Sequence, residues 1–219
     1  MNATKDDTPS PGSARERAYQ AIRAGILNGD CAPGQFIEEA LACELAGVSR
    51  SPVREALNRL AAEGFLELHP RRGALVRMLS ATEIRDLFEV RLMVESHAVS
   101  RICREGRTVP DEMAAICTRH EAVSATDMLA CTELNRQFHQ ALVAAAGNVV
   151  LLQVFNSLEA NLTRIAMLSL QSGLGKTETI EREHRSLIDA LTRHDEAAAL
   201  GLLKQHLQPL PRLSRAMAG

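Results

Sequence analysis

The chain has 219 residues, which suffice for one large domain or two modest ones. The formal net charge of −2 at pH 7 gives no overall sign of a nucleic-acid-binding protein, and no apolar run approaches the roughly 18 residues that span a membrane. Apolar residues make up 46% and aromatic residues only 3%, which favours a core of small aliphatic side chains between closely packed helices.

Residues 1–12 are polar and lack the apolar segment of a secretory signal. We therefore predict a disordered tail and a cytoplasmic protein without membrane association. The cysteines are widely spaced and form no CxxC pair, which indicates reduced and mostly buried thiols. They are Cys31, Cys43, Cys103, Cys117 and Cys131.

Two helices are predicted before residue 49. The first begins after Ser13, a suitable N-cap, and ends at the turn "NGD". The second covers "FIEEALACELAGV" from Phe36 onward, and Gly47 ends it.

A third helix is predicted in "SRSPVREALNRLAAEG", with Ser51 as N-cap and Pro52 at the first helical position. Its buried stripe consists of Val53, Leu57 and Leu60. The following "FLELHPRRGALVRM" predicts two short strands around a turn. Three helices and a β-hairpin predict a winged helix-turn-helix DNA-binding domain over residues 13–78.

Residues 79–219 predict an all-helical bundle, which makes the fold mainly α. Ser80 and Glu83 form an S-x-x-E capping box at the start of a helix that runs to about residue 105. Further helical patterns cover residues 110–123, 127–146, 148–171, 177–193 and 195–208.

The third helix and the hairpin turn carry candidate DNA-binding residues. A recognition helix places its N-terminal residues at base edges in the major groove, where arginine bonds guanine in a bidentate pair. The candidates are Ser49, Arg50, Ser51 and Arg54 on the helix, and Arg71, Arg72 and Gly73 in the turn. Residues 13–78 hold nine Arg and eight Asp or Glu, so these arginines alone favour a solvated helix face. Their combination with a helix-turn-helix and a basic hairpin turn favours DNA binding instead.

The stretch "VSRSPVREALNRLAAEGFLELHPRRGALV" resembles the DNA-binding domain of the GntR family of bacterial transcription regulators. The resemblance is free of gaps, covers roughly residues 14–78, and implies that Arg50 and Arg54 read bases. A helical C-terminal domain is similar to the effector domain, called FCD, of the FadR-type subfamily. Ala40 departs from this pattern, because the FadR regulator carries another DNA-contacting arginine at that position.

Three histidines on three predicted helices suggest a metal site. Asn135 and His139 are four residues apart on one helix face, while His184 and His206 lie on the last two helices. Facing side chains of a helical bundle commonly build metal sites, and neutral imidazole suits zinc, nickel, copper or iron. The alternative is that each histidine is an ordinary hydrogen-bonded residue. Glu183 precedes His184 and is expected on another helix face.

The resemblance strengthens the metal interpretation. Metal-binding FCD domains carry patterns similar to "NRQFHQALVAAAGN", "EHRSLIDAL" and the terminal His206, which implies a divalent ion, zinc or nickel, at Asn135, His139, His184 and His206. Many members have Asp where this chain has Asn135. An amide oxygen is a weaker ligand than a carboxylate, so we expect weaker metal retention.

Candidate effector-binding residues are Arg91, Asn161 and Arg164. "EVRLMVESHAV" is similar to an FCD stretch in which Arg91 would hold an effector carboxylate, although Arg91 and Glu95 are also spaced for a simple ion pair. The resulting hypothesis is a homodimeric repressor that a small carboxylate effector releases from a pseudo-palindromic operator in double-stranded DNA. Alternatives are a metal-sensing regulator or a three-histidine metalloenzyme, although no HExxH motif occurs.

Overall fold

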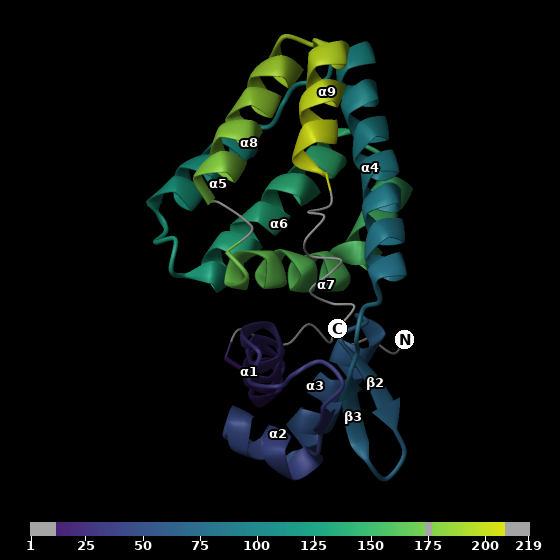
Figure 1. Cartoon of the computed structure of the whole chain (residues 1–219), viewed down its shortest axis with the longest axis vertical. Helices are drawn as coiled ribbons and strands as arrows, with labels where there is room; N and C mark the ends of the chain where they lie inside the picture. The colour runs from purple at the N-terminus through teal and green to yellow at the C-terminus, as the bar shows by residue number, and fades with distance from the viewer. Residues whose placement is uncertain (1–11, 174–176, 209–219) are drawn as a thin grey trace, which may run out of the picture. The chain divides into compact units, whose positions relative to one another are not determined.

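The computed structural model describes residues 12–173 and 177–208, so most of the predicted tail and the end of the last domain lie outside it. The chain divides between Met78 and Leu79 into two compact units (Figure 1). No described helix is both long and apolar enough to cross a membrane.

The N-terminal unit contains three helices and a three-stranded antiparallel sheet, which confirms the winged helix-turn-helix prediction. The helices are α1 (Ala14–Asn28), α2 (Glu39–Ala46) and α3 (Arg50–Ala62). The strands are β1 (Phe36–Ile37), β2 (Leu66–His69) and β3 (Gly73–Val76), in the order β1-β3-β2. Helices α1 and α3 pack against each other, and the predicted stripe of Val53, Leu57 and Leu60 is buried.

The prediction of one continuous helix from Phe36 was wrong. Phe36 and Ile37 form β1 and pair with Leu75 and Ala74 of β3, and α2 begins only at Glu39. Pairing with β3 satisfies the backbone of these two residues and buries Ile37 completely. A tertiary contact therefore overrides the local helical pattern.

Helix α3 also begins earlier than predicted. Ser49 is the N-cap and Arg50 the first helical residue, so Pro52 occupies the third helical position rather than the first. The first helical N–H groups have no acceptor within the helix, so a proline in the first turn costs no hydrogen bond at that position. The prediction of Ser51 as N-cap was therefore wrong, because Ser51 is the second helical residue, and the side chain of the actual N-cap, Ser49, makes no capping hydrogen bond.

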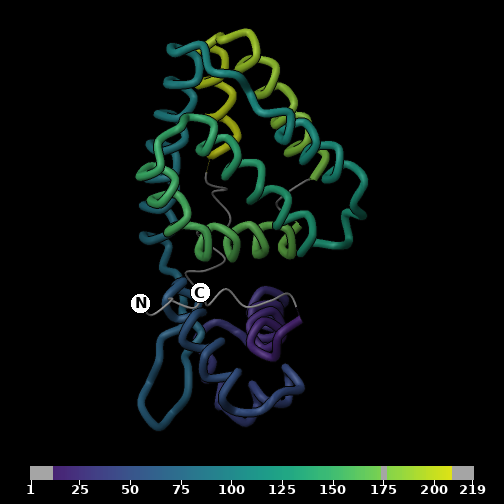
Figure 2. The backbone as a smooth tube through the Cα atoms, turned by 180° about the vertical axis from the view of Figure 1, so that it is seen from behind, coloured from purple at the N-terminus to yellow at the C-terminus, as the bar shows by residue number. Residues whose placement is uncertain are grey.

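The C-terminal unit is all-helical in its described residues, 79–173 and 177–208, as the sequence predicts. Its helices are α4 (Ala81–Arg104), α5 (Asp111–Ala122), α6 (Met128–Ala145), α7 (Val149–Gln171), α8 (Thr177–Thr192) and α9 (Glu196–His206). Helix α9 packs between α4 and α8, and α7 packs against α6 (Figures 1 and 2).

Two local predictions for this unit are confirmed. Ser80 and Glu83 form the complete capping box at the start of α4, with the Ser80 Oγ accepting from the Glu83 N–H. The cysteines of this unit, Cys103, Cys117 and Cys131, are buried free thiols as predicted; in the N-terminal unit Cys31 is also buried and Cys43 is partly exposed. The main core lies among α4, α5, α6, α8 and α9, where Phe138 and Leu142 are fully buried.

Candidate DNA interface and metal centre

The recognition helix and the hairpin turn line one groove in the N-terminal unit. Arg50 and Arg54 come from α3, Arg71 and Arg72 come from the β2–β3 turn, and Gly73 is the first residue of β3. The groove has a volume of about 720 Å³. Five candidates that are up to 23 positions apart in the sequence therefore face one space. Ser49 and Ser51 are exposed beside it at the start of α3 but do not line it.

Arg54 shares this groove with an acidic partner that the sequence did not reveal. Its Nε donates to the Glu39 Oε1 at 2.6 Å, from α3 to α2. The hydrogen bond from Arg54 lowers the pKa of the Glu39 carboxyl, so Glu39 is ionised at neutral pH. The Arg54 side chain stays 61% exposed, which leaves its other donors accessible to a ligand in the groove.

The two arginines of the β2–β3 turn have different surroundings. The Arg72 guanidinium lies 4.3 Å from the centre of the Phe36 ring, in a cation–π contact with β1. Arg71 has a φ of 66° and is exposed. Gly73 has a φ of 93°, and a Cβ there would collide with the carbonyl oxygen of Ile37. Strand β1 thus requires glycine at the base of the turn and fixes one of its arginines.

The three histidines predicted as metal ligands converge in the C-terminal unit. The Nε2 atoms of His139 and His206 are 3.1 Å apart, and those of His184 and His206 are 3.3 Å apart. One ligand nitrogen from each residue lies within 4.8 Å of those of the other two. The side chains come from α6, α8 and α9, and His139 and His184 are buried.

Two carboxylates determine which nitrogen of His139 and of His206 faces the centre of the three histidines. Glu95 lies 2.7 Å from the Nδ1 of His139, and Glu183 lies 2.7 Å from the Nδ1 of His206. An ionised carboxylate accepts, so each Nδ1 carries the proton and each Nε2 directs its lone pair at the centre. The prediction that Glu183 faces away from the site was wrong.

His184 lacks such a carboxylate among the described residues and is held by stacking. Its ring lies 3.7 Å from that of Phe138, nearly parallel at 9°. Burial lowers the pKa of His184 well below its usual range and that of His139 to about 4. Both rings are therefore neutral at pH 7, which is the form that binds metals.

This donor set fits a divalent metal ion. Nitrogen lone pairs 3.1–3.3 Å apart repel each other unless a proton or a metal cation lies between them. Three imidazoles whose rings are held by hydrogen bonds to carboxylates are typical of sites for zinc and related ions. Asn135, one helical turn before His139, lines the same cavities as His139 and His206, so it can add an amide oxygen.

A cavity of about 400 Å³ adjoins the histidines. Its polar lining includes Arg91, His120, Asn135, Glu183 and His206, and apolar side chains of α7 line it from another side. The Arg91 Nε donates to the Glu95 Oε1 at 2.7 Å, so the expected ion pair forms and is buried. Arg91 thus lines the cavity and also anchors the carboxylate that orients His139.

The other two effector candidates are not brought to this cavity. Asn161 and Arg164 lie on α7 but do not line it, whereas Leu162 and Ile165 on the same helix do. Arg164 is buried, and the Oδ1 of Asn161 has no hydrogen-bond partner among the described residues. The helical periodicity of α7 turns the two polar side chains to a different face.

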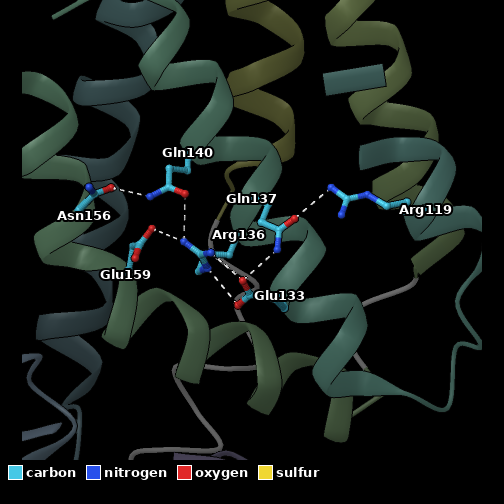
Figure 3. Close-up of polar contacts among 7 residues, drawn as sticks. All are labelled: Arg119, Glu133, Arg136, Gln137, Gln140, Asn156 and Glu159. Carbon is cyan, nitrogen blue, oxygen red and sulfur yellow. Dashed lines mark hydrogen bonds and ion pairs between the residues drawn. The ribbon is translucent and has the colours of Figure 1, made fainter. Parts of the chain in front are cut away.

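A polar network fixes α6 beside α7 (Figure 3). Arg136 donates to Glu133 and Glu159 at 2.6 Å each, and Gln140 donates to Asn156 of α7 at 3.1 Å. The hydrogen bond to Glu133, outweighing burial, raises the pKa of Arg136 above its usual value. Because Arg136 follows Asn135 directly, this network fixes the rotation of α6 that directs Asn135 and His139 inward.

A winged helix-turn-helix with arginines in its groove, joined to a helical domain that contains a cavity, is typical of a DNA-binding regulator. Family models agree: "Bacterial regulatory proteins, gntR family" matches residues 14–76, and "FCD domain" matches residues 86–209. The chain belongs to the GntR family of transcription regulators and carries the FCD domain of the FadR-type subfamily. It is a transcription regulator and not an enzyme.

Curated relatives support this assignment. The chain is 30% identical to the HTH-type transcriptional repressor GlaR of Escherichia coli over 92% of this chain and 96% of that protein. It is 31% identical to the Nta operon transcriptional regulator of Aminobacter aminovorans, over 84% and 88%. The solved structure of E. coli McbR/YncC shares the fold, with a TM-score of 0.72, 19% identity and coverage of 95% and 100%.

Proposed function

We propose that the protein is a homodimeric repressor that acts in the cytoplasm and leaves its operator when a small carboxylate binds the helical domain. The groove that joins the N-terminus of α3 to the arginine turn is the observation that carries the DNA-binding part. Arg50 and Arg54 would bond guanines in the major groove, and the exposed Arg71 would reach the adjacent minor groove. One relative, GlaR, is named a repressor, which supports repression rather than activation.

Substitution of Arg54 tests the base-reading role. An operator is first selected with the wild-type protein from a library of genomic fragments, and its affinity for each variant is then measured by fluorescence anisotropy. Arg54→Ala should weaken binding by about 1–3 kcal/mol. Arg15→Ala is the matched control, because Arg15 is also exposed and ion-paired but lies on α1, outside the groove. Equal effects of both substitutions would exclude base reading by Arg54.

Exposed apolar side chains support the homodimer. Val90 and Met93 on α4 and Val149, Val150 and Val154 on α7 are 39–71% exposed, and α4 packs against α7. A second copy that covers these side chains would place two DNA-binding domains on a pseudo-palindromic site. Light scattering should report a dimer for the wild type and a monomer for Val150→Asp; a dimer in both would exclude this face.

We further propose that His139, His184 and His206, with Asn135, hold zinc or nickel. When bound, the ion supplies a Lewis-acidic position for an effector carboxylate. Arg91 lines the same cavity and would donate a hydrogen bond to the effector, and the cavity volume of about 400 Å³ limits the effector to a small molecule. The effector must bind the two DNA-binding states with different affinities, or the operator equilibrium would not change.

Elemental analysis tests the metal, and DNA release tests the effector. Metal content of the purified wild type should exceed that of His184→Ala, and equal contents would exclude the site. Operator binding is then titrated with metal alone and with metal plus small mono- and dicarboxylates. Release by carboxylates at constant metal supports an effector receptor, whereas a response to metal alone identifies a metal sensor.

A further inference from the structure

Two glutamates lie behind the three-histidine centre, and only one of them is paired with an arginine. All four proposed ligands are neutral, so only residues behind them can offset the charge of a divalent ion. Glu95 is one such residue, but Arg91 lies 2.7 Å from it and cancels its charge. Glu183 is the other, and among residues 12–173 and 177–208 no arginine or lysine forms an ion pair with it.

We propose that Glu183 is a positioning residue that supplies, through His206, the negative charge that Asn135 does not provide. This role rests on the proposed metal site. The Nδ1–H of His206 donates to Glu183 over 2.7 Å, which orients the ring and increases the electron density at its Nε2. Glu183 also lines the cavity, so its charge acts on the bound ion at short range.

A second glutamate of α8 contacts a histidine that is not a proposed metal ligand. Glu181, two positions earlier on α8, also lies close to an imidazole, 3.0 Å from the Nδ1 of His120. His120 is not among the three converging histidines. Glu181 therefore provides a control with the same residue type, the same helix and the same kind of partner, but its imidazole is not one of the proposed ligands.

The test is a double-substitution cycle on the full chain. Zinc affinity is measured by competition with a chromophoric chelator for the wild type, Glu183→Gln, Asn135→Asp and the double variant. Glutamine keeps an oxygen that accepts from His206 and removes only the charge. Glu183→Gln should weaken zinc binding about 10- to 100-fold, as is common when a residue that hydrogen-bonds to a metal-binding histidine is substituted. Asn135→Asp should strengthen it, and Glu181→Gln should leave it unchanged.

The cycle distinguishes charge compensation from simple ring orientation. In the Asn135→Asp background the added carboxylate already offsets half of the charge of the ion, so Glu183→Gln should cost less there than in the wild type. A purely orienting hydrogen bond would cost the same in both backgrounds, and that result would overturn the proposal.

Two other results would also overturn it: an unchanged zinc affinity in Glu183→Gln, or an equal loss in Glu181→Gln. Circular dichroism in the presence of a chelator verifies that each variant is folded. If the wild type binds no zinc or nickel, the proposed metal site itself fails, and that failure is distinct from zinc binding that does not depend on Glu183.

Discussion

The buried ion pair of α4 should be far more important for stability than an exposed pair with the same spacing on the same helix. Arg91 and Glu95 are 10% and 0% exposed, with 2.7 Å between Nε and Oε1. Arg101 and Glu105 are 29% and 46% exposed, with 2.9 Å between the same atoms. Removing one partner of a buried pair leaves an uncompensated charge, whereas water solvates the remaining partner of an exposed pair.

Glu95→Gln should therefore destabilise the helical unit by about 3–5 kcal/mol, and Glu105→Gln by less than about 1 kcal/mol. The penalty at Glu95 is increased because the Nδ1–H of His139 also loses its ionised acceptor. The assay is urea unfolding with a chelator present, followed by circular dichroism at 222 nm. Emission of the only tyrosine, Tyr19, follows the N-terminal unit separately. Equal destabilisation by the two substitutions would refute the reasoning from burial.

Three further predictions concern stability. Acidification of the metal-free protein from pH 7 to pH 4 should lower the free energy of unfolding by roughly 3 kcal/mol. Burial lowers the pKa of His139 to about 4, so between these pH values the unfolded chain binds a proton that the folded state largely excludes. An unfolding free energy that does not change with pH would contradict this. Gly73→Ala should destabilise the N-terminal unit by about 1–3 kcal/mol, since its Cβ meets the Ile37 carbonyl at a positive φ, and thermal unfolding measures the loss. Ser80→Ala should cost about 1 kcal/mol in urea unfolding and Ser49→Ala less, because only Ser80 caps its helix through its side chain.

The sequence predicted the fold wherever short-range patterns decide the structure. The apolar stripe of α3 and the capping box of α4 involve residues within a few positions of each other, and both are confirmed. Strand β1 was missed because its structure depends on β3: Phe36 pairs with Leu75, 39 positions away. Nothing within a helical-period window around Phe36 reports that pairing, and the local pattern favoured a longer helix.

The candidate sites show the same division. The sequence predicts the three histidine ligands from their positions on three helices and from the family pattern. It does not predict that two carboxylates orient two of these histidines. Glu95 is 44 positions from His139 and Glu183 is 23 positions from His206, so neither contact has a local signature. Asn161 and Arg164 are polar residues on the helix after "AGN", but sequence alone does not determine which face of α7 meets the cavity.

The ion pair between Arg54 and Glu39 should help the groove to distinguish the operator from unrelated DNA. Glu39 holds the Arg54 Nε and places a negative charge in the groove that repels phosphates, and only a base with two well-placed acceptors for the remaining Arg54 donors compensates for that repulsion. Glu39→Gln should thus strengthen binding to an unrelated duplex more than binding to the selected operator, so the ratio of the two dissociation constants falls. Both constants are measured at one salt concentration, because phosphate contacts depend on salt. Glu55→Gln, which releases Arg15 outside the groove, removes the same charge and should leave the ratio unchanged. If both variants change the ratio equally, the effect is general electrostatics and not discrimination by Arg54.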